Sequence, residues 1–128
     1  MAFHKFFKQI NEGIPVSIYG DGSQTRDFTY VDDIVRGTIS SAKTEGIAGE
    51  AFNLGSGTSS VLNDVLKIFE ELLGEFEVNY EPKKSGDVTH TLADITKAKQ
   101  MLAYRPRVTL KEGLNNLLNW FKKMPLNI

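Results

Sequence analysis

The sequence predicts a small mixed α/β domain in which helices dominate and a few short strands connect them. Over several stretches of ten or more residues, apolar side chains recur every three or four positions, which is typical of an amphipathic helix. Glycine and proline clusters separate these stretches, and only short runs between them alternate as a strand does. The length of 128 residues allows one hydrophobic core, so we expect residues 1–128 to form a single domain.

The first third of the chain predicts two helices and two extended segments. In order, we expect a helix with Phe3, Phe6, Phe7 and Ile10 on one face that ends near Gly13, a strand over Val16–Tyr19, a turn over Gly20–Ser23, an extended segment over Thr25–Tyr30, and a helix that carries Val31, Ile34, Val35, Thr38 and Ala42. Asp32 and Asp33 could suggest paired acid–base carboxylates or a metal site. Stabilisation of a helix start by negative charge is the favoured interpretation.

The rest of the chain predicts three more helices and two short strands. We first expect a loop over Gly46–Gly49, a buried strand over Ala51–Leu54 and a small-residue loop over Gly55–Ser60. A helix follows that Gly74 ends and that has on one face Leu62, Val65, Leu66, Phe69, Leu72 and Leu73, and after it come a strand in which Phe76, Val78 and Tyr80 alternate and a polar loop over Lys83–Asp87. The last two elements are a helix with Ile95, Ala98 and Leu102, which Asp94 caps and Pro106 ends, and a helix that has on one face Leu110, Leu114, Leu117, Leu118 and Phe121. Thr109 and Glu112 have the spacing of a capping box at the start of this last helix.

The composition excludes several classes of function. Fifteen basic residues against 16 acidic ones give a net charge of −1, so we expect no nucleic-acid partner. The sequence has neither an apolar run long enough to span a membrane nor a secretory signal at its start. Without cysteine there is no disulfide, thiolate nucleophile or zinc–thiolate site. These features favour a cytoplasmic protein.

A glycine-rich loop suggests a dinucleotide-binding motif but matches it only in part. Gly55 and Gly57 follow a predicted strand and precede a predicted helix. The motif requires a third glycine, for close packing of helix and strand, where this chain has Ser60. Glu81 lies at about the right distance to be the acid that binds a ribose. A tight turn without a ligand is the favoured interpretation.

Other reactive side chains favour structural or surface roles. Tyr80 and Lys84 match the Tyr-x-x-x-Lys pattern of short-chain dehydrogenases, which requires a helix to place both on one face. Pro82 lies between them and the flanking alternation predicts a strand, so this match is interpreted as coincidence. His4 and His90 have no partners at ligand spacing, and His4 is expected on the polar, solvent-facing side of the first helix.

The segment from Tyr19 to Asp33 is dense in groups that recognise ligands. It combines an aromatic ring, a glycine turn and several hydrogen-bonding side chains around Arg26. A guanidinium that follows a glycine turn can bind a phosphate through its planar fork. From the residues alone, a structural loop and strand remains slightly the better interpretation.

This segment closely resembles a signature of the extended short-chain dehydrogenase/reductases, a group of NAD-dependent epimerases and dehydratases that act on nucleotide sugars. The signature reads Tyr-Gly-x-Gly-x-Gln-x-Arg-Asp-Phe-x-Tyr-Val-x-Asp. The resemblance continues, in the same order, through Phe52–Gly55, Ser85–Asp87, Ala93–Ala98, Leu102–Pro106 and Leu110–Leu114. It therefore covers nearly the whole chain, and it is most like UDP-glucose 4-epimerase. It implies the C-terminal substrate-binding portion of such an enzyme, with the Rossmann core largely missing.

The resemblance also assigns roles to residues. In the family, the stretch that corresponds to Val16, Ile18 and Tyr19 lines the pocket for the base, with backbone groups that meet a uracil. Arg26 matches the arginine that pairs with the diphosphate. Asp87 matches an acid that helps to hold the ribose in an Arg-Pro-Gly-Asp loop. In this chain that loop begins with Lys84 and Ser85, so the cation is kept but the planar fork is lost, and the loop is expected to be less rigid.

The resemblance implies NAD as the cofactor of an intact enzyme, with hydride removed from and returned to the sugar C4. The family's glycine-rich NAD motif and its helical Tyr-x-x-x-Lys are missing from this chain, so we expect it to be inactive and to bind no cofactor by itself. Its expected partners are a UDP-sugar or another nucleotide sugar and the NAD-binding half of the same enzyme. A nucleotide-sugar 4,6-dehydratase, a UDP-glucuronate decarboxylase or epimerase, and a non-catalytic nucleotide-binding or protein-interaction module are the alternatives.

Truncation would leave apolar faces bare. Soluble monomers avoid large exposed apolar surfaces. We therefore expect a homo-oligomer formed through exposed apolar surface, or strand exchange at an edge near Phe52.

Overall fold

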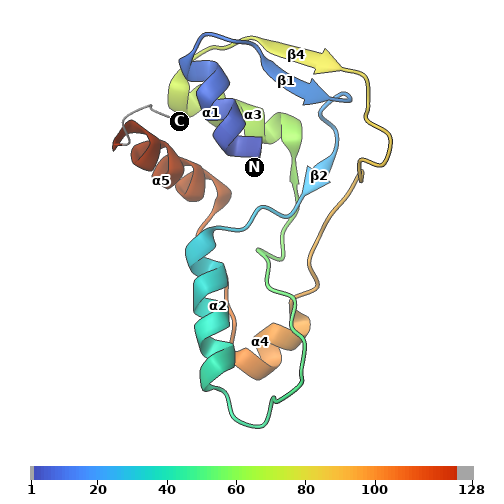
Figure 1. Cartoon of the computed structure of the whole chain (residues 1–128), viewed down its shortest axis with the longest axis vertical. Coiled ribbons are helices and arrows are strands. Elements are labelled where there is room, and N and C mark those ends of the chain that lie inside the picture. The colour runs from blue at the N-terminus through green and yellow to red at the C-terminus, as the bar shows by residue number, and fades with distance from the viewer. Residues whose placement is uncertain (1, 124–128) are drawn as a thin grey trace. The chain divides into compact units, whose positions relative to one another are not determined.

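The computed structural model describes residues 2–123 and contains five helices and four short strands in that range (Figure 1). In chain order these are α1 (Ala2–Asn11), β1 (Val16–Tyr19), β2 (Thr25–Arg26), α2 (Val31–Lys43), β3 (Ser60–Val61), α3 (Leu62–Leu73), β4 (Val78–Glu81), α4 (Thr96–Leu102) and α5 (Leu110–Lys123). The mixed, mainly helical fold class is therefore confirmed. The chain divides into two compact units: unit 1 comprises residues 2–24, 61–89 and 114–123, and unit 2 comprises residues 25–60 and 90–113.

Unit 1 is built on a parallel pair of strands and a cluster of aromatic rings. β1 pairs with β4, with Val16 opposite Val78 and Tyr19 opposite Glu81. In Figure 1 the two strands run side by side, next to α1 and α3. Val16 and Ile18 are fully buried, because alternate residues of a strand face the same side. The core of the unit is completed by tilted and edge-on aromatic rings of α1, α3 and α5, namely Phe3, Phe6, Phe7, Phe69 and Phe121.

Unit 2 packs α2 and α4 around a smaller apolar cluster. Its buried members are Ile95, Ala98, Leu102 and Tyr104, and Ile47, Phe52, Leu54 and Ala93 pack against them. α2 approaches this cluster closely at Gly37, where an added Cβ would lie 2.8 Å from a methyl carbon of Leu54 and 3.0 Å from the Tyr104 ring. Glycine at this point of the helix therefore lets backbone and core come together.

Most of the predicted elements are confirmed. The first strand has the predicted bounds, α3 ends at Gly74 with a φ of 86°, and β4 overlaps the predicted alternating segment and continues to Glu81. The capping box is present: the Thr109 backbone N–H and side-chain hydroxyl donate to Glu112 at 2.8 Å and 2.7 Å, and the Glu112 N–H donates back to the Thr109 hydroxyl at 3.3 Å. Asp94 accepts a hydrogen bond from the Thr96 N–H at the start of α4.

Two predicted extended segments differ from the structure. Ala51–Leu54 is irregular rather than a strand. Phe52 and Leu54 are apolar because they pack onto the cluster of unit 2. This packing does not require the segment to pair with another strand. The edge near Phe52 at which strand exchange was expected is therefore not a strand edge. Within Thr25–Tyr30 only Thr25–Arg26 is a strand, and it pairs with β3, which the sequence did not predict.

One face of α2 is apolar and exposed. Val31, Val35 and Ile39 follow at intervals of four residues and are 62%, 47% and 48% exposed. Asp33 and Gly37 on the opposite side are buried. We call these three side chains the α2 stripe. Among the described residues, no helix is both long and apolar enough to cross a membrane.

Candidate functional site

The free edge of β1 carries a backbone donor and acceptor side by side. The N–H groups of Val16 and Gly20 donate to the carbonyls of Glu77 and Glu81, each at 2.8 Å, so alternate residues from Val16 onward face β4. The backbone groups of Ser17 and Tyr19 consequently point to the opposite edge. The Ser17 carbonyl and the Tyr19 N–H lie two residues apart there, with the spacing that binds one residue of a neighbouring parallel strand.

Two glutamine side chains hold this edge at either end. Gln9 Nε2 donates to the Pro15 carbonyl at 3.1 Å, and Gln24 Nε2 donates to the Tyr19 carbonyl at 2.9 Å. Both glutamines occupy carbonyls that flank the Ser17 and Tyr19 pair. They therefore fix the strand end without covering it by another strand.

Tyr19 and Lys84, which were both predicted as binding residues, lie in contact. The Lys84 Nζ is 4.0 Å from the centre of the Tyr19 ring. Hydrogen bonding with Tyr19 raises the pKa of Lys84 above its ordinary value, so the side chain stays cationic at neutral pH. Asp87 lies in the same turn as Lys84, because its N–H donates to the Lys84 carbonyl at 3.2 Å and Gly86 between them has a φ of 85°.

The glycine turn that follows β1 is held by Asn63, at the start of α3. Asn63 Nδ2 donates to the Asp21 carbonyl at 3.0 Å, and its backbone N–H donates to the Gly22 carbonyl at 3.0 Å. The Tyr80 hydroxyl donates to Asn63 Oδ1 at 3.3 Å. Tyr80 therefore has a structural hydrogen bond in β4, and the predicted strand rather than a helix contains it. Sequence analysis did not identify Asn63 as part of this region.

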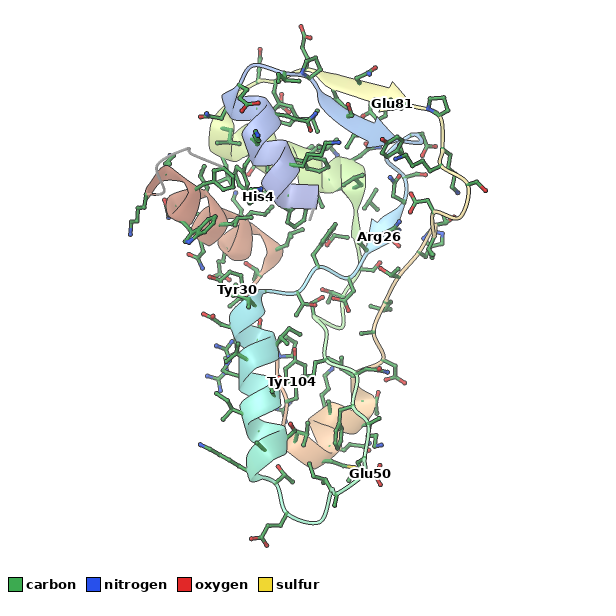
Figure 2. All side chains as sticks on the ribbon, in the orientation of Figure 1. His4, Arg26, Tyr30, Glu50, Glu81 and Tyr104 are labelled. Carbon is green, nitrogen blue, oxygen red and sulfur yellow. The ribbon has the colours of Figure 1, made fainter. Side chains whose placement is uncertain are left out.

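Arg26 lies in unit 2, on β2 (Figure 2). Its Nη1 donates to the Thr25 carbonyl at 2.9 Å, and the residue is partly buried. Val16, Ile18, Tyr19, Lys84 and Asp87 all belong to unit 1. The structure thus brings Tyr19, Lys84 and the turn of Asp87 together, and it buries the side chains of Val16 and Ile18 so that only their strand is available to a ligand.

The carboxylate of Asp27, next to Arg26, binds the glycine-rich loop. Ser56 donates to Asp27 Oδ1 through its N–H at 2.8 Å and its hydroxyl at 2.6 Å, and the Gly57 N–H donates to Oδ2 at 3.2 Å. Burial alone would raise the pKa of Asp27, but hydrogen bonds from Ser56, Ala93 and Thr29 outweigh it and hold the pKa below its ordinary value. The loop amides that would cradle a dinucleotide phosphate are therefore bound to a carboxylate. The loop does not fit an NAD site.

Asp33 does more than place a favourable charge at the start of α2, because its buried carboxylate links this helix to the backbone of Arg107 and Val108. It is 1% exposed and accepts hydrogen bonds from the N–H groups of Arg107 at 2.8 Å and Val108 at 3.1 Å, and from the Arg36 guanidinium. Burial would raise the pKa of Asp33, but these donors lower it below the ordinary value. Across residues 2–123, no group of three or more acidic, histidine or cysteine side chains is arranged to hold a metal ion.

The two histidines have defined contacts. His4, which was expected at the surface on the polar side of the first helix, is partly exposed, and its ring lies 4.7 Å from the ring of Phe121, because α5 packs beside α1 within unit 1. A helical period within α1 could not reveal a neighbour from the far end of the chain. His90 Nδ1 lies 2.9 Å from the Thr25 hydroxyl, where the two residues form an isolated parallel bridge.

Comparison with known proteins identifies the class to which this fold and these motifs belong. The profile of a family described as GDP-mannose 4,6 dehydratase matches residues 2–117. A UDP-glucuronate 4-epimerase of Thermodesulfobacterium geofontis is 43% identical over 125 residues, which cover 96% of this chain and 38% of that protein.

Solved structures agree with this match. The chain is similar to UDP-glucuronic acid 4-epimerase from Bacillus cereus in complex with UDP-glucuronic acid and NAD, with a TM-score of 0.90, 39% identity, and coverage of 96% of this chain and 40% of that one. It is also similar to UDP-glucose 4-epimerase of Thermotoga maritima with UDP-glucose, with a TM-score of 0.89, 35% identity, and the same coverage of 96% and 40%.

The protein is therefore a member of the NAD-dependent epimerase/dehydratase family, and it corresponds to the C-terminal part of these enzymes. The resemblance inferred from the sequence is confirmed. The chain spans about 40% of the length of the relatives that it matches.

Proposed function

We propose that this chain is the UDP-sugar-binding portion of an NAD-dependent nucleotide-sugar 4-epimerase. The observation that carries the proposal is the backbone edge of β1 that faces away from β4, with its glycine turn and the Tyr19–Lys84 pair at one end. Polar recognition by a backbone edge, a cation and an acid suits a nucleotide better than an apolar ligand.

The base binds at the free edge of β1. Uracil carries an N–H between two carbonyls, and the adjacent Ser17 carbonyl and Tyr19 N–H can accept from the N–H and donate to one carbonyl. The base thereby takes the place of one residue of an added strand. Because this recognition uses backbone groups, Val16 and Ile18 contribute by fixing the strand from the buried side.

The remaining polar groups bind the rest of the nucleotide. Asp87 accepts a hydrogen bond from a ribose hydroxyl, and Lys84 supplies a cation held over an aromatic face. Arg26 binds the diphosphate through its planar fork. Binding energy from these parts of the substrate positions the reacting carbon of the sugar in the intact enzyme.

The hydride chemistry would come from NAD bound by another part of an intact enzyme. Because the Gly55–Gly57 loop is engaged by Asp27, this chain by itself is proposed to be catalytically inactive and free of cofactor. The intact protein is proposed to be cytoplasmic. The second candidate is a nucleotide-sugar 4,6-dehydratase, favoured by the description of the family that matches residues 2–117.

A proposal of another class is a self-standing module that binds a nucleotide or a protein without taking part in catalysis. It shares the nucleotide site, so UDP binding does not separate it from the leading proposal. The coding sequence upstream of Met1 does. An in-frame glycine-rich NAD motif and a helical Tyr-x-x-x-Lys would exclude the module.

Titration calorimetry of UDP and of uridine tests the binding proposal. Arg26→Ala is expected to weaken UDP by about tenfold or more, the typical effect of a lost charge-assisted hydrogen bond, and to leave uridine unchanged. Arg105→Ala, which removes an exposed arginine elsewhere in unit 2, is the control and should alter neither affinity. Absence of UDP binding by the unsubstituted chain, or equal loss for both ligands in Arg26→Ala, would overturn the assignment.

A further inference from the structure

The Asp27 carboxylate joins three segments of unit 2 that are far apart in the sequence. Besides the loop at Ser56 and Gly57, its Oδ2 accepts a hydrogen bond from the Ala93 N–H at 3.2 Å, and its Oδ1 accepts one from the Thr29 hydroxyl at 3.1 Å. Three of its donors are backbone amides. A carboxylate saturated in this way resists reorientation, because each broken bond would leave a partly buried donor unpaired.

The segment of β2 and Asp27 is also held through its backbone. The Thr91 N–H donates to the Thr25 carbonyl at 3.1 Å, and the Asp27 N–H donates to the Thr91 hydroxyl at 3.3 Å. Thr25 also forms an isolated parallel bridge with His90, the residue before Thr91. Residues 25–27 are therefore fixed against residues 90–93 at both ends, with Arg26 in the middle.

This arrangement sets the direction of Arg26. Arg26 is the last residue of β2 and Asp27 follows it directly. Because Asp27 is fastened toward the loop of residues 56–57, the backbone from which the Arg26 side chain leaves is fixed. The glycine loop contributes to this because Gly55 allows close approach: an added Cβ would lie 2.7 Å from Asp27 Oδ2 and 2.6 Å from the Ala93 Cβ.

We propose that Asp27 is a positioning residue, whose bonds to the amides of Ser56, Gly57 and Ala93 aim the Arg26 guanidinium at the diphosphate of the nucleotide sugar. The inference rests on the proposed function for the identity of the ligand. It adds that the Gly55–Gly57 loop, which looks like a phosphate cradle, serves phosphate binding indirectly by holding Asp27. Preorganisation of this kind matters because a charged group misplaced by about 1 Å loses much of its effect.

The test compares the ratio of uridine and UDP dissociation constants, which isolates the contribution of the diphosphate. Asp27→Asn replaces an acceptor oxygen by an amide group that cannot accept from an N–H, so it should lower this ratio by about fivefold or more. Asp33→Asn is the matched control, because the Asp33 carboxylate also accepts hydrogen bonds from backbone amides in unit 2. Both variants should lower the melting temperature, but only Asp27→Asn should change the ratio.

The possible outcomes separate the two proposals. If Arg26→Ala lowers the ratio and Asp27→Asn does not, Asp27 does not position Arg26, and the binding proposal stands. If Arg26→Ala leaves the ratio unchanged, the phosphate role of Arg26 fails and the positioning role fails with it. Should Asp27→Asn not fold, Ser56→Ala removes one of the two hydroxyl donors to Oδ1, together with the contacts of that hydroxyl with Thr58. It is expected to lower the ratio by about twofold, and an unchanged ratio would overturn the inference.

Discussion

The ammonium group of Lys84 lies 4.0 Å from the centre of the Tyr19 ring, and this contact joins the polar turn of residues 84–87 to the end of β1. A cation over an aromatic face is held in place while its remaining N–H donors stay available. The contact therefore provides a preoriented positive charge in unit 1.

Lys84→Met keeps the apolar stem and removes the charge. We expect it to weaken UDP by about twofold to fivefold, the effect of one exposed cationic contact, with little change for uridine. Lys84→Arg should restore UDP affinity or improve it, because the guanidinium stacks on Tyr19 and adds a planar fork. Calorimetry with both ligands checks this. Equal weakening of uridine in Lys84→Met would mean that the side chain supports the base site rather than the phosphates.

Gly22→Ala is expected to destabilise the fold through two separate effects. Gly22 has a φ of 75°, and an added Cβ would lie 2.0 Å from Asn63 Oδ1. The backbone strain alone costs about 1–2 kcal/mol, and the clash with Asn63 adds about 1–3 kcal/mol.

Gly46→Ala is the control for Gly22→Ala, because Gly46 has the same φ of 75° but no atom within 4 Å of an added Cβ. The difference between the two variants in the free energy of urea unfolding measures the clash. Adding Asn63→Ala to Gly22→Ala should recover part of the stability. Equal losses for Gly22→Ala and Gly46→Ala would show that Asn63 moves aside freely.

Sequence reasoning succeeded where a feature is local and failed where distant segments meet. The bounds of β1, the end of α3 at Gly74 and the Thr109–Glu112 capping box follow from neighbours along the chain. The Tyr19–Lys84 contact joins residues that are 65 positions apart in the sequence. Only the resemblance to a family implied that both residues bind the same ligand.

The same limit explains the interpretations that changed. Asp33 looked like a helix-start charge because its partners, the amides of Arg107 and Val108, carry no side-chain signal in the sequence. The Gly55–Gly57 loop looked like a partial phosphate cradle because nothing local reveals that Asp27 occupies its amides. Backbone partners of a buried carboxylate become visible only with the fold.

Acid should unfold the protein partly through Asp33. Its pKa in the folded state is lowered below the ordinary value of 3.8, so the stabilisation from its ionised form is complete above that value and is lost as the pH falls through the folded pKa. Asp27 acts in the same direction. We expect the free energy of unfolding to fall steeply below about pH 4.

Asp33→Asn tests this assignment because it removes the titrating group. At pH 7 it should cost about 2–3 kcal/mol, since the Arg107 and Val108 amides lose acceptors in a buried site. Between about pH 5 and pH 3 its stability should change less than that of the unsubstituted protein. Urea unfolding at several pH values measures both. Parallel pH profiles for the two proteins would show that Asp33 does not carry the acid sensitivity.

The α2 stripe should drive self-association of this chain. Val31, Val35 and Ile39 form a continuous apolar strip on the solvent side of α2, and burying such surface contributes about 25 cal/mol per Å². In an intact enzyme we propose that the stripe packs against the NAD-binding part that the relatives have in addition. In this chain alone, a second copy can cover it. Sedimentation velocity at increasing concentration should therefore show a dimer or a larger species.

Val35→Asp places a charge in the centre of the stripe and should shift the chain toward the monomer, because burying an unpaired carboxylate is costly. Met101→Asp is the control, since it adds the same charge at an isolated exposed apolar side chain of α4. It should leave the association unchanged. A monomer at all concentrations for the unsubstituted chain would exclude the α2 stripe as an association surface. Equal dissociation by both substitutions would exclude it too, since an effect specific to the stripe requires that only Val35→Asp weakens the contact.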